Sequence, residues 1–203
     1  MQKKSRILSP QEANKISEIL KNDGVIAFPT DTVWGLGCNP DNKKAVEKIY
    51  DLKSRDAKKP LILMSSKLEY LLPYVDNFSE EEMSMANKFL PGALTIIANK
   101  SSKTPDFVTS NLQTVGIRIP NHKVFMEITN LAPNKVLATT SANLSTQPSA
   151  LKKEDVKKYF GEKLDYIADD FGYFSENSES TIIVYKNNGW HVLRQGVIKI
   201  GNE

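Results

Sequence analysis

The sequence predicts an α/β fold in which helices flank one mixed β-sheet. Three observations support this prediction. Apolar runs of strand length outnumber the segments whose apolar residues have helical spacing. The two kinds of segment do not alternate strictly, which favours a mixed sheet over a doubly wound parallel one. The 203 residues contain no internal repeat and no linker-like tract, so we expect a single domain over residues 1–203.

Capping signals define the helices of the first half. Ser9 with Glu12 and Ser79 with Glu82 have the spacing of capping boxes, which mark helix starts. The predicted helices cover residues 9–24, 41–52 and 79–92. The predicted strands cover residues 25–28, 61–64, 93–98 and 115–119. The stretch 29–37, rich in hydroxyl groups and glycine, is predicted to be a loop.

The second half continues in the same mixed style. The predicted helices cover residues 122–131 and 152–159. The predicted strands cover residues 136–140, 181–185 and 190–194, with a shorter one near Tyr166. Asn187, Asn188 and Gly189 separate the last two strands and predict a hairpin turn.

Composition excludes several classes of protein. Lys and Arg number 27 against 24 Asp and Glu, and this net charge of +3 is too small to indicate nucleic-acid binding by itself. The single cysteine, Cys38, excludes an internal disulfide and disfavours a cysteine zinc site. No stretch approaches the roughly 18 apolar residues of a membrane span. We therefore expect a cytoplasmic protein with no membrane association.

The common catalytic and metal motifs do not match. Gly35 and Gly37 are followed by Cys-Asn-Pro, which fits neither the dinucleotide fingerprint nor the phosphate loop. No Gly-x-Ser-x-Gly elbow is present. His122 and His191 lie far apart without metal-ligand spacing, so we expect surface or packing roles for them and no metal site.

Cationic and small polar residues instead gather where predicted strands end. They are Lys53, Arg55, Lys59, Arg118, Ser141, Asn143 and Arg194. Because ligands of open α/β sheets bind at strand ends, these residues predict a site for a polyanion. Two alternatives remain open. A lysine-rich loop is often only solvated surface, and Arg118, within an apolar strand, can form an internal salt bridge.

Seven motifs carry a resemblance to a known family. They are residues 29–37 (PTDTVWGLG), Lys53-Ser54-Arg55 with Lys59-Pro60-Leu61, residues 91–95 (PGALT), 118–120 (RIP), 141–145 (SANLS), 180–184 (STIIV) and 194–196 (RQG). In this order they resemble the short form of the YrdC-like family of threonylcarbamoyl-AMP synthases, also called TsaC. The resemblance implies a YrdC-like fold, with a twisted mixed β-sheet flanked by helices around a concave basic cavity.

The resemblance also implies a reaction. L-threonine, bicarbonate and ATP would form threonylcarbamoyl-AMP and pyrophosphate, with Mg²⁺ carried by ATP. A separate tRNA threonylcarbamoyl-transferase complex would use the product to modify tRNA. Since the carbamate of threonine is itself a nucleophile, positioning and charge neutralisation matter more than a general base.

Site residues follow from the same resemblance. Charge neutralisation during catalysis is expected from Lys53, Arg55 and Lys59. The ATP side is expected to comprise Arg55, Lys59, Thr114, Ser141, Asn143, Ser149 and Arg194. The threonine side is expected to comprise Thr32, Met64, Arg118, Thr139 and Ser180, with Arg118 gripping the amino-acid carboxylate.

Two other functions remain open from the sequence. One is a module that binds tRNA or double-stranded RNA without turnover, to which the lysine-rich helix 152–159 would contribute. The other is a carbamoyl-adenylating domain of the kind found in hydrogenase maturation proteins. Those proteins carry additional acylphosphatase and zinc-finger-like segments, which this sequence does not contain.

Overall fold

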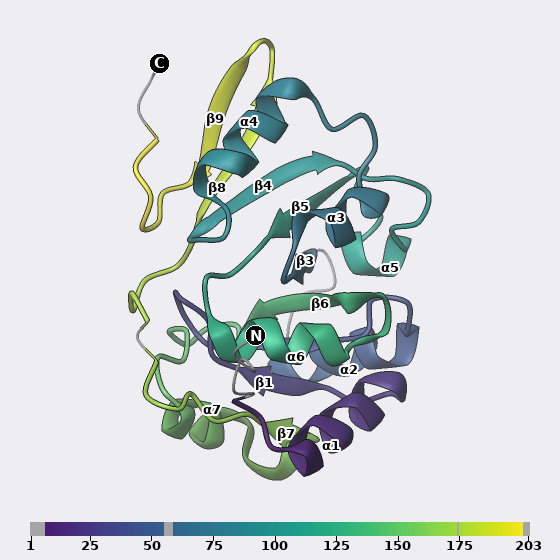
Figure 1. Cartoon of the computed structure of the whole chain (residues 1–203), viewed down its shortest axis with the longest axis vertical. Helices are drawn as coiled ribbons and strands as arrows, with labels where there is room; N and C mark the ends of the chain where they lie inside the picture. The colour runs from purple at the N-terminus through teal and green to yellow at the C-terminus, as the bar shows by residue number, and fades with distance from the viewer. Residues whose placement is uncertain (1–6, 55–58, 174, 201–203) are drawn as a thin grey trace, which may run out of the picture.

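A mixed β-sheet organises the chain in the computed structural model, which describes residues 7–54, 59–173 and 175–200 (Figure 1). Within these residues the strand order is β7-β1-β2-β6-β3-β5-β4-β8-β9. The strands are β1 (Ile26–Phe28), β2 (Gly35–Cys38), β3 (Ile62–Ser65), β4 (Leu94–Asn99), β5 (Thr114–Arg118), β6 (Val136–Ser141), β7 (Tyr166–Ile167), β8 (Thr181–Lys186) and β9 (Gly189–Arg194). The pairs β1–β7, β3–β5 and β4–β8 are parallel and the other neighbours are antiparallel, which confirms the mixed sheet.

Helices cover the sheet on both faces. They are α1 (Pro10–Lys21), α2 (Lys43–Lys53), α3 (Leu68–Leu71), α4 (Glu80–Phe89), α5 (Asp106–Thr109), α6 (Lys123–Leu131) and α7 (Lys153–Phe160), with 3-10 turns η1 (Leu72–Tyr74), η2 (Pro133–Lys135) and η3 (Gly161–Lys163). In Figure 1, α6 lies across β6, and α1 lies beside β1. None of the helices described is long and apolar enough to cross a membrane.

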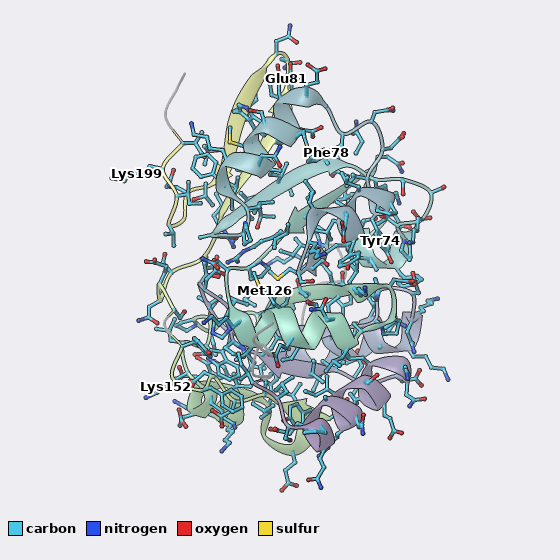
Figure 2. All side chains as sticks on the ribbon, in the orientation of Figure 1. Tyr74, Phe78, Glu81, Met126, Lys152 and Lys199 are labelled. Atoms are coloured by element: carbon cyan, nitrogen blue, oxygen red, sulfur yellow. The ribbon has the colours of Figure 1, made fainter. Side chains whose placement is uncertain are left out.

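Two apolar layers follow from the alternation of side chains along each strand. Leu63 and Ala138 belong to a layer that includes buried residues of α2, α4 and α7, whereas Met64 and Leu137 belong to a layer with α1 and α6. Successive strand residues point to opposite faces, so one sheet supports both layers. Charged side chains such as Glu81 and Lys152 are exposed on the outside of the molecule (Figure 2).

The helix starts confirm the capping boxes. The Ser9 hydroxyl accepts a hydrogen bond from the Glu12 backbone N–H, and the Glu12 carboxylate accepts one from the Ser9 N–H. Ser79 and Glu82 make the same pair of bonds at α4. The start of the second helix differs slightly, because Asn42 rather than Asp41 caps α2. The short helices α3 and α5 were not predicted.

One loop prediction is wrong, because residues 35–38 form strand β2, which lies inside the sheet between β1 and β6. Both glycines of this strand lie against the ring of Phe28, which leaves no space for a Cβ atom at either position. A Cβ atom on Gly35 would lie 2.7 Å from Cε2 of Phe28, and one on Gly37 would lie 2.7 Å from Cε1 of the same ring. Phe28 is fully buried and packs on Phe125 with ring centroids 5.1 Å apart, so it has little freedom to move.

This packing predicts that Gly35→Ala destabilises the protein by about 1–3 kcal/mol, because the added methyl overpacks the Phe28 ring. Urea unfolding measures the change. Gly189→Ala is the matched control, since a Cβ atom at Gly189 meets nothing within 4 Å. Equal stabilities of the two variants would contradict the packing explanation.

Candidate active site

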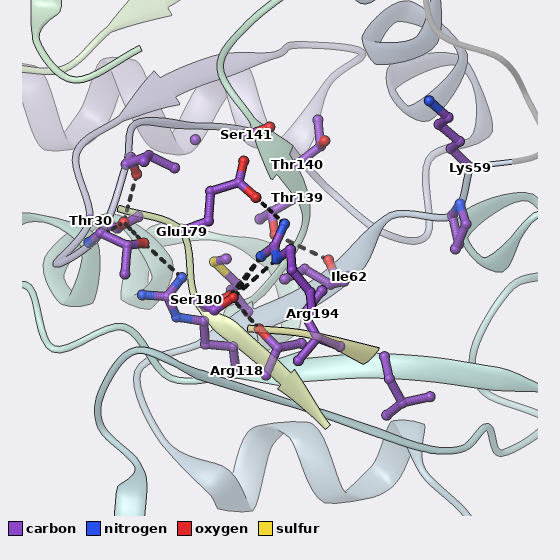
Figure 3. Close-up of a pocket in the computed structure, with 18 of the residues that line it drawn as sticks. Thr30, Lys59, Ile62, Arg118, Thr139, Thr140, Ser141, Glu179, Ser180 and Arg194 are labelled. Atoms are coloured by element: carbon purple, nitrogen blue, oxygen red, sulfur yellow. Dashed lines mark hydrogen bonds and ion pairs between the residues drawn. The ribbon is translucent and has the colours of Figure 1, made fainter. Parts of the chain in front are cut away.

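A cavity of about 390 Å³ lies where β3, β4, β5, β6, β8 and β9 meet the loop before β2 (Figure 3). Three cationic side chains, Lys59, Arg118 and Arg194, are among its described lining, together with one carboxylate, Glu179. Hydroxyl groups of the threonine and serine residues surround the cations. The lining therefore carries the chemistry of an anion site, with donors from segments far apart in the sequence.

Arg118, the last residue of β5, is only 3% exposed, and each of its three guanidinium nitrogens donates a hydrogen bond within the protein. Its Nε donates to the Gly92 carbonyl at 3.1 Å, its Nη1 to Thr32 Oγ1 at 2.9 Å and its Nη2 to Asp31 Oδ1 at 2.5 Å. This confirms the internal salt bridge left open by the sequence. Each terminal nitrogen also carries a second N–H, so Arg118 retains donors for a ligand in the cavity.

Burial lowers the pKa of Arg118, while the adjacent Asp31 opposes that shift and Arg194 adds to it. Arg118 is buried and Arg194 is half-exposed, and each of them already pairs with a carboxylate. Two cations that line one cavity favour the binding of a further anion near both.

The loop before β2 is built to hold the Arg118 partners. Thr30 Oγ1 donates to the Val33 carbonyl at 2.6 Å, accepts from the Thr32 N–H at 3.1 Å, and lies 3.0 Å from Thr32 Oγ1. Residues 175–176 hold the backbone of this loop in place. The Glu176 N–H donates to the Asp31 carbonyl at 2.8 Å, and the Ser175 hydroxyl donates to the Thr32 carbonyl. Asp31 and Thr32 are therefore fixed before any ligand arrives.

Arg194, on β9, forms the second cationic group. Its Nε and Nη2 donate to the Ser180 carbonyl at 3.1 and 2.9 Å, and Nη2 also reaches Ser180 Oγ at 3.1 Å. Its Nη1 pairs with the Glu179 carboxylate, which also accepts a 2.8 Å bond from the Ser149 hydroxyl. Ser180 Oγ lies 2.9 Å from Thr95 Oγ1, which links the group to β4.

Lys53 has a different position from the one expected. Its side chain is 1% exposed and is not part of the cavity lining. Its Nζ donates to the Asn143 carbonyl at 2.6 Å, to Asn143 Oδ1 at 2.9 Å and to the Ser141 carbonyl. Ser145 closes the connection, because its N–H and Oγ donate to the Lys53 carbonyl at 3.2 and 3.1 Å. Lys53 thus holds the loop after β6.

The other predicted site residues divide into two groups. The cavity lining brings together Thr32, Lys59, Met64, Arg118, Thr139, Ser141, Ser180 and Arg194. Three further predicted residues do not belong to that lining, namely Thr114, Asn143 and Ser149. Thr114 begins β5, at the opposite end from Arg118. Ser149 and Asn143 contact lining residues, Glu179 and Ser141. Arg55 lies outside the described residues.

Sequence reasoning missed the two carboxylates, Asp31 and Glu179. Asp31 lies within the PTDTVWGLG motif, but its partner Arg118 is 87 positions away in the sequence. Glu179 directly precedes the STIIV motif, but its partners Ser149 and Arg194 are 30 and 15 positions away, and no local spacing connects them. Of the histidines, His122 is buried and packs edge-on against Tyr173, and His191 is exposed, as the packing and surface roles predicted.

A model of the Sua5/YciO/YrdC family, described as "Telomere recombination", matches residues 18–196. The chain belongs to the Sua5/YciO/YrdC family. A relative in this family, the threonylcarbamoyl-AMP synthase of Vibrio campbellii, is 35% identical over 152 residues, which cover 74% of this chain and 82% of the relative. The resemblance inferred from the seven motifs is confirmed.

Solved structures of the Sua5/YciO/YrdC family confirm the fold. A variant of Pyrococcus abyssi Sua5 superposes with a TM-score of 0.88 at 31% identity, over 95% of this chain. The same Sua5 in complex with L-threonine gives a TM-score of 0.86, also at 31% identity and over 93% of this chain. This chain covers 59% and 55% of those two Sua5 chains, respectively.

The buried position of Lys53 predicts that Lys53→Met lowers the free energy of unfolding by about 1–3 kcal/mol, because the Ser141 and Asn143 oxygens lose their donor. Urea unfolding tests this. Lys44→Met is the control, since Lys44 is exposed and lies 3.8 Å from its partner Asp23. A Lys53→Met variant that is as stable as the wild type but inactive would instead assign Lys53 to the reaction itself.

Proposed function

We propose that this chain is a threonylcarbamoyl-AMP synthase that forms threonylcarbamoyl-AMP and pyrophosphate from L-threonine, bicarbonate and ATP. The observation that carries the proposal is the presence of two arginine groups, Arg118 and Arg194, in one cavity. The substrates bring two separate anionic groups, an amino-acid carboxylate and a polyphosphate. The family membership and the named activity of the relatives support the same assignment.

Arg118 and Thr32 form the threonine end of the cavity. The remaining N–H groups of Arg118 bind the carboxylate of the amino acid, while its bonds to Asp31 and Gly92 keep the guanidinium in place. Met64 and Thr139 complete this end, and Met64 supplies an apolar contact for the threonine methyl group. Ser180 bonds to Arg194 and lies between the two arginines (Figure 3).

Arg194, Lys59 and Ser141 form the nucleotide end. Lys59 is exposed and lines the cavity, so it is placed to neutralise phosphate charge. Ser141 is positioned by the loop that Lys53 holds, and its hydroxyl donates to Asn143 Oδ1 at 2.7 Å. We therefore assign Lys53 and Asn143 to positioning of this loop, and Lys59 and Arg194 to contact with phosphates.

The arrangement favours attack at the α-phosphorus by proximity. Threonine held at Arg118 presents its amine towards the middle of the cavity, where the amine nitrogen bonds to the carbon of bicarbonate, a C–O bond breaks, water leaves and a carbamate is formed. The carbamate oxygen bonds to the α-phosphorus as the bond to the pyrophosphate oxygen breaks, and the cations at the nucleotide end take up the leaving charge. Mg²⁺ bound to the phosphates would neutralise part of that charge, and Glu179 is a carboxylate ligand of the type Mg²⁺ accepts.

The product is a labile adenylate, so we propose that a tRNA threonylcarbamoyl-transferase complex in the cytoplasm consumes it. The alternative, an RNA-binding module without turnover, stays a prediction that the assay below also tests.

Pyrophosphate release from ATP is the decisive measurement. We expect release by the purified protein with Mg²⁺ only when threonine and bicarbonate are both present, with threonylcarbamoyl-AMP detected by mass. Release that needs neither co-substrate would point to another nucleotide reaction. Complete lack of turnover, together with salt-dependent tRNA binding, would favour the RNA-binding alternative.

Arg118→Lys keeps the charge but removes the planar fork, so it should raise the KM for threonine about tenfold or more and leave the KM for ATP within about twofold. Initial rates at varied threonine and varied ATP give both constants. A circular-dichroism melt confirms that the buried variant is folded. An unchanged KM for threonine would remove Arg118 from the binding of the carboxylate.

A further inference from the structure

Glu179 is a carboxylate in the middle of a site for anions. It lines the cavity, where it pairs with Arg194 (Figure 3). Its other oxygen accepts a hydrogen bond from Ser149, and both partners are residues expected on the ATP side. The Glu179 and Arg194 side chains are 38% and 41% exposed, so a ligand entering the cavity can reach both. Without a nucleotide, Glu179 occupies the donors that phosphate oxygens would use.

We infer that Glu179 makes this site select nucleotide that carries a divalent cation over free nucleotide, an inference that rests on the proposed function. The argument is one of charge. Free ATP can take the second N–H of Arg194 Nη1 or displace Glu179 from that nitrogen, and in either case its phosphates lie beside the Glu179 carboxylate with no added cation. Like charges at close range in a partly enclosed cavity oppose binding.

A divalent cation on the phosphates removes this penalty. When the Arg194 Nη1 turns from Glu179 to a phosphate oxygen, the carboxylate can turn to the cation, so both charged groups of the protein keep a partner of opposite sign. Mg²⁺ commonly takes one or two protein carboxylates in addition to substrate phosphates, and Glu179 is the described carboxylate of the cavity lining.

The test is the binding of ATP without threonine or bicarbonate, measured by calorimetric titration in EDTA and in excess MgCl₂. In the wild type we expect Mg²⁺ to strengthen binding clearly. In Glu179→Gln we expect free ATP to bind more tightly than in the wild type, because the competing charge is gone. The ratio of the two affinities should fall by about tenfold. Glu162→Gln removes the same charge from an exposed site in η3 and should leave the ratio unchanged.

Each outcome is decisive. An equal ratio in Glu179→Gln and the wild type would overturn the inference. A Glu179→Gln variant that melts normally but binds ATP under neither condition would also overturn it, because Glu179 would then serve to hold Arg194 in place for the nucleotide. A wild type that binds no ATP under either condition would instead overturn the proposed function itself, and this inference with it.

Discussion

The buried ammonium group of Lys53 is the interaction on which the site depends. Lys53 lies at the end of α2, and its Nζ donates to oxygens of the loop after β6. The backbone carbonyl of Lys53 accepts a hydrogen bond from Ser145. A buried cation is stable only where such acceptors are already in position. The end of a helix on one face and a loop at the edge of the cavity are therefore fixed relative to each other. Ser141, which lines the cavity, takes its place from this arrangement.

The two arginines of the cavity are stabilised in a related way. Arg118 pairs with Asp31 and Arg194 pairs with Glu179, so neither guanidinium is left uncompensated in the ligand-free protein. The pairs differ in their surroundings. Arg118 is buried, Asp31 is mostly buried, and both are held by backbone contacts, which suits a fixed recognition element for a carboxylate. Arg194 and Glu179 are half exposed, which suits an exchange of partners.

Local signals predicted the fold well. The Ser9–Glu12 capping box lies within one turn of helix, so its effect can be read from neighbouring residues. Strand β2 could not be predicted in this way, because Gly35 is required by the Phe28 ring on the adjacent strand and not by a turn. Eight of the site residues expected from the motif resemblance line the cavity. It did not identify Glu179, whose role depends on side chains brought to it only by the folded sheet.

The order of the strands also bears on how the protein is made. The Arg118 side of the cavity uses the loop before β2, and the Arg194 side uses β9, so the cavity joins residues from both ends of the matched region. β4 reaches its parallel neighbour β8 only after most of the chain has been synthesised. Pairing between such distant segments slows folding, because long loops must close before the contacts form. A nascent chain that ends before β8 lacks Ile182, Leu193 and Arg194 of the cavity lining, so a ligand that uses this side of the cavity binds the finished fold and stabilises it as a whole.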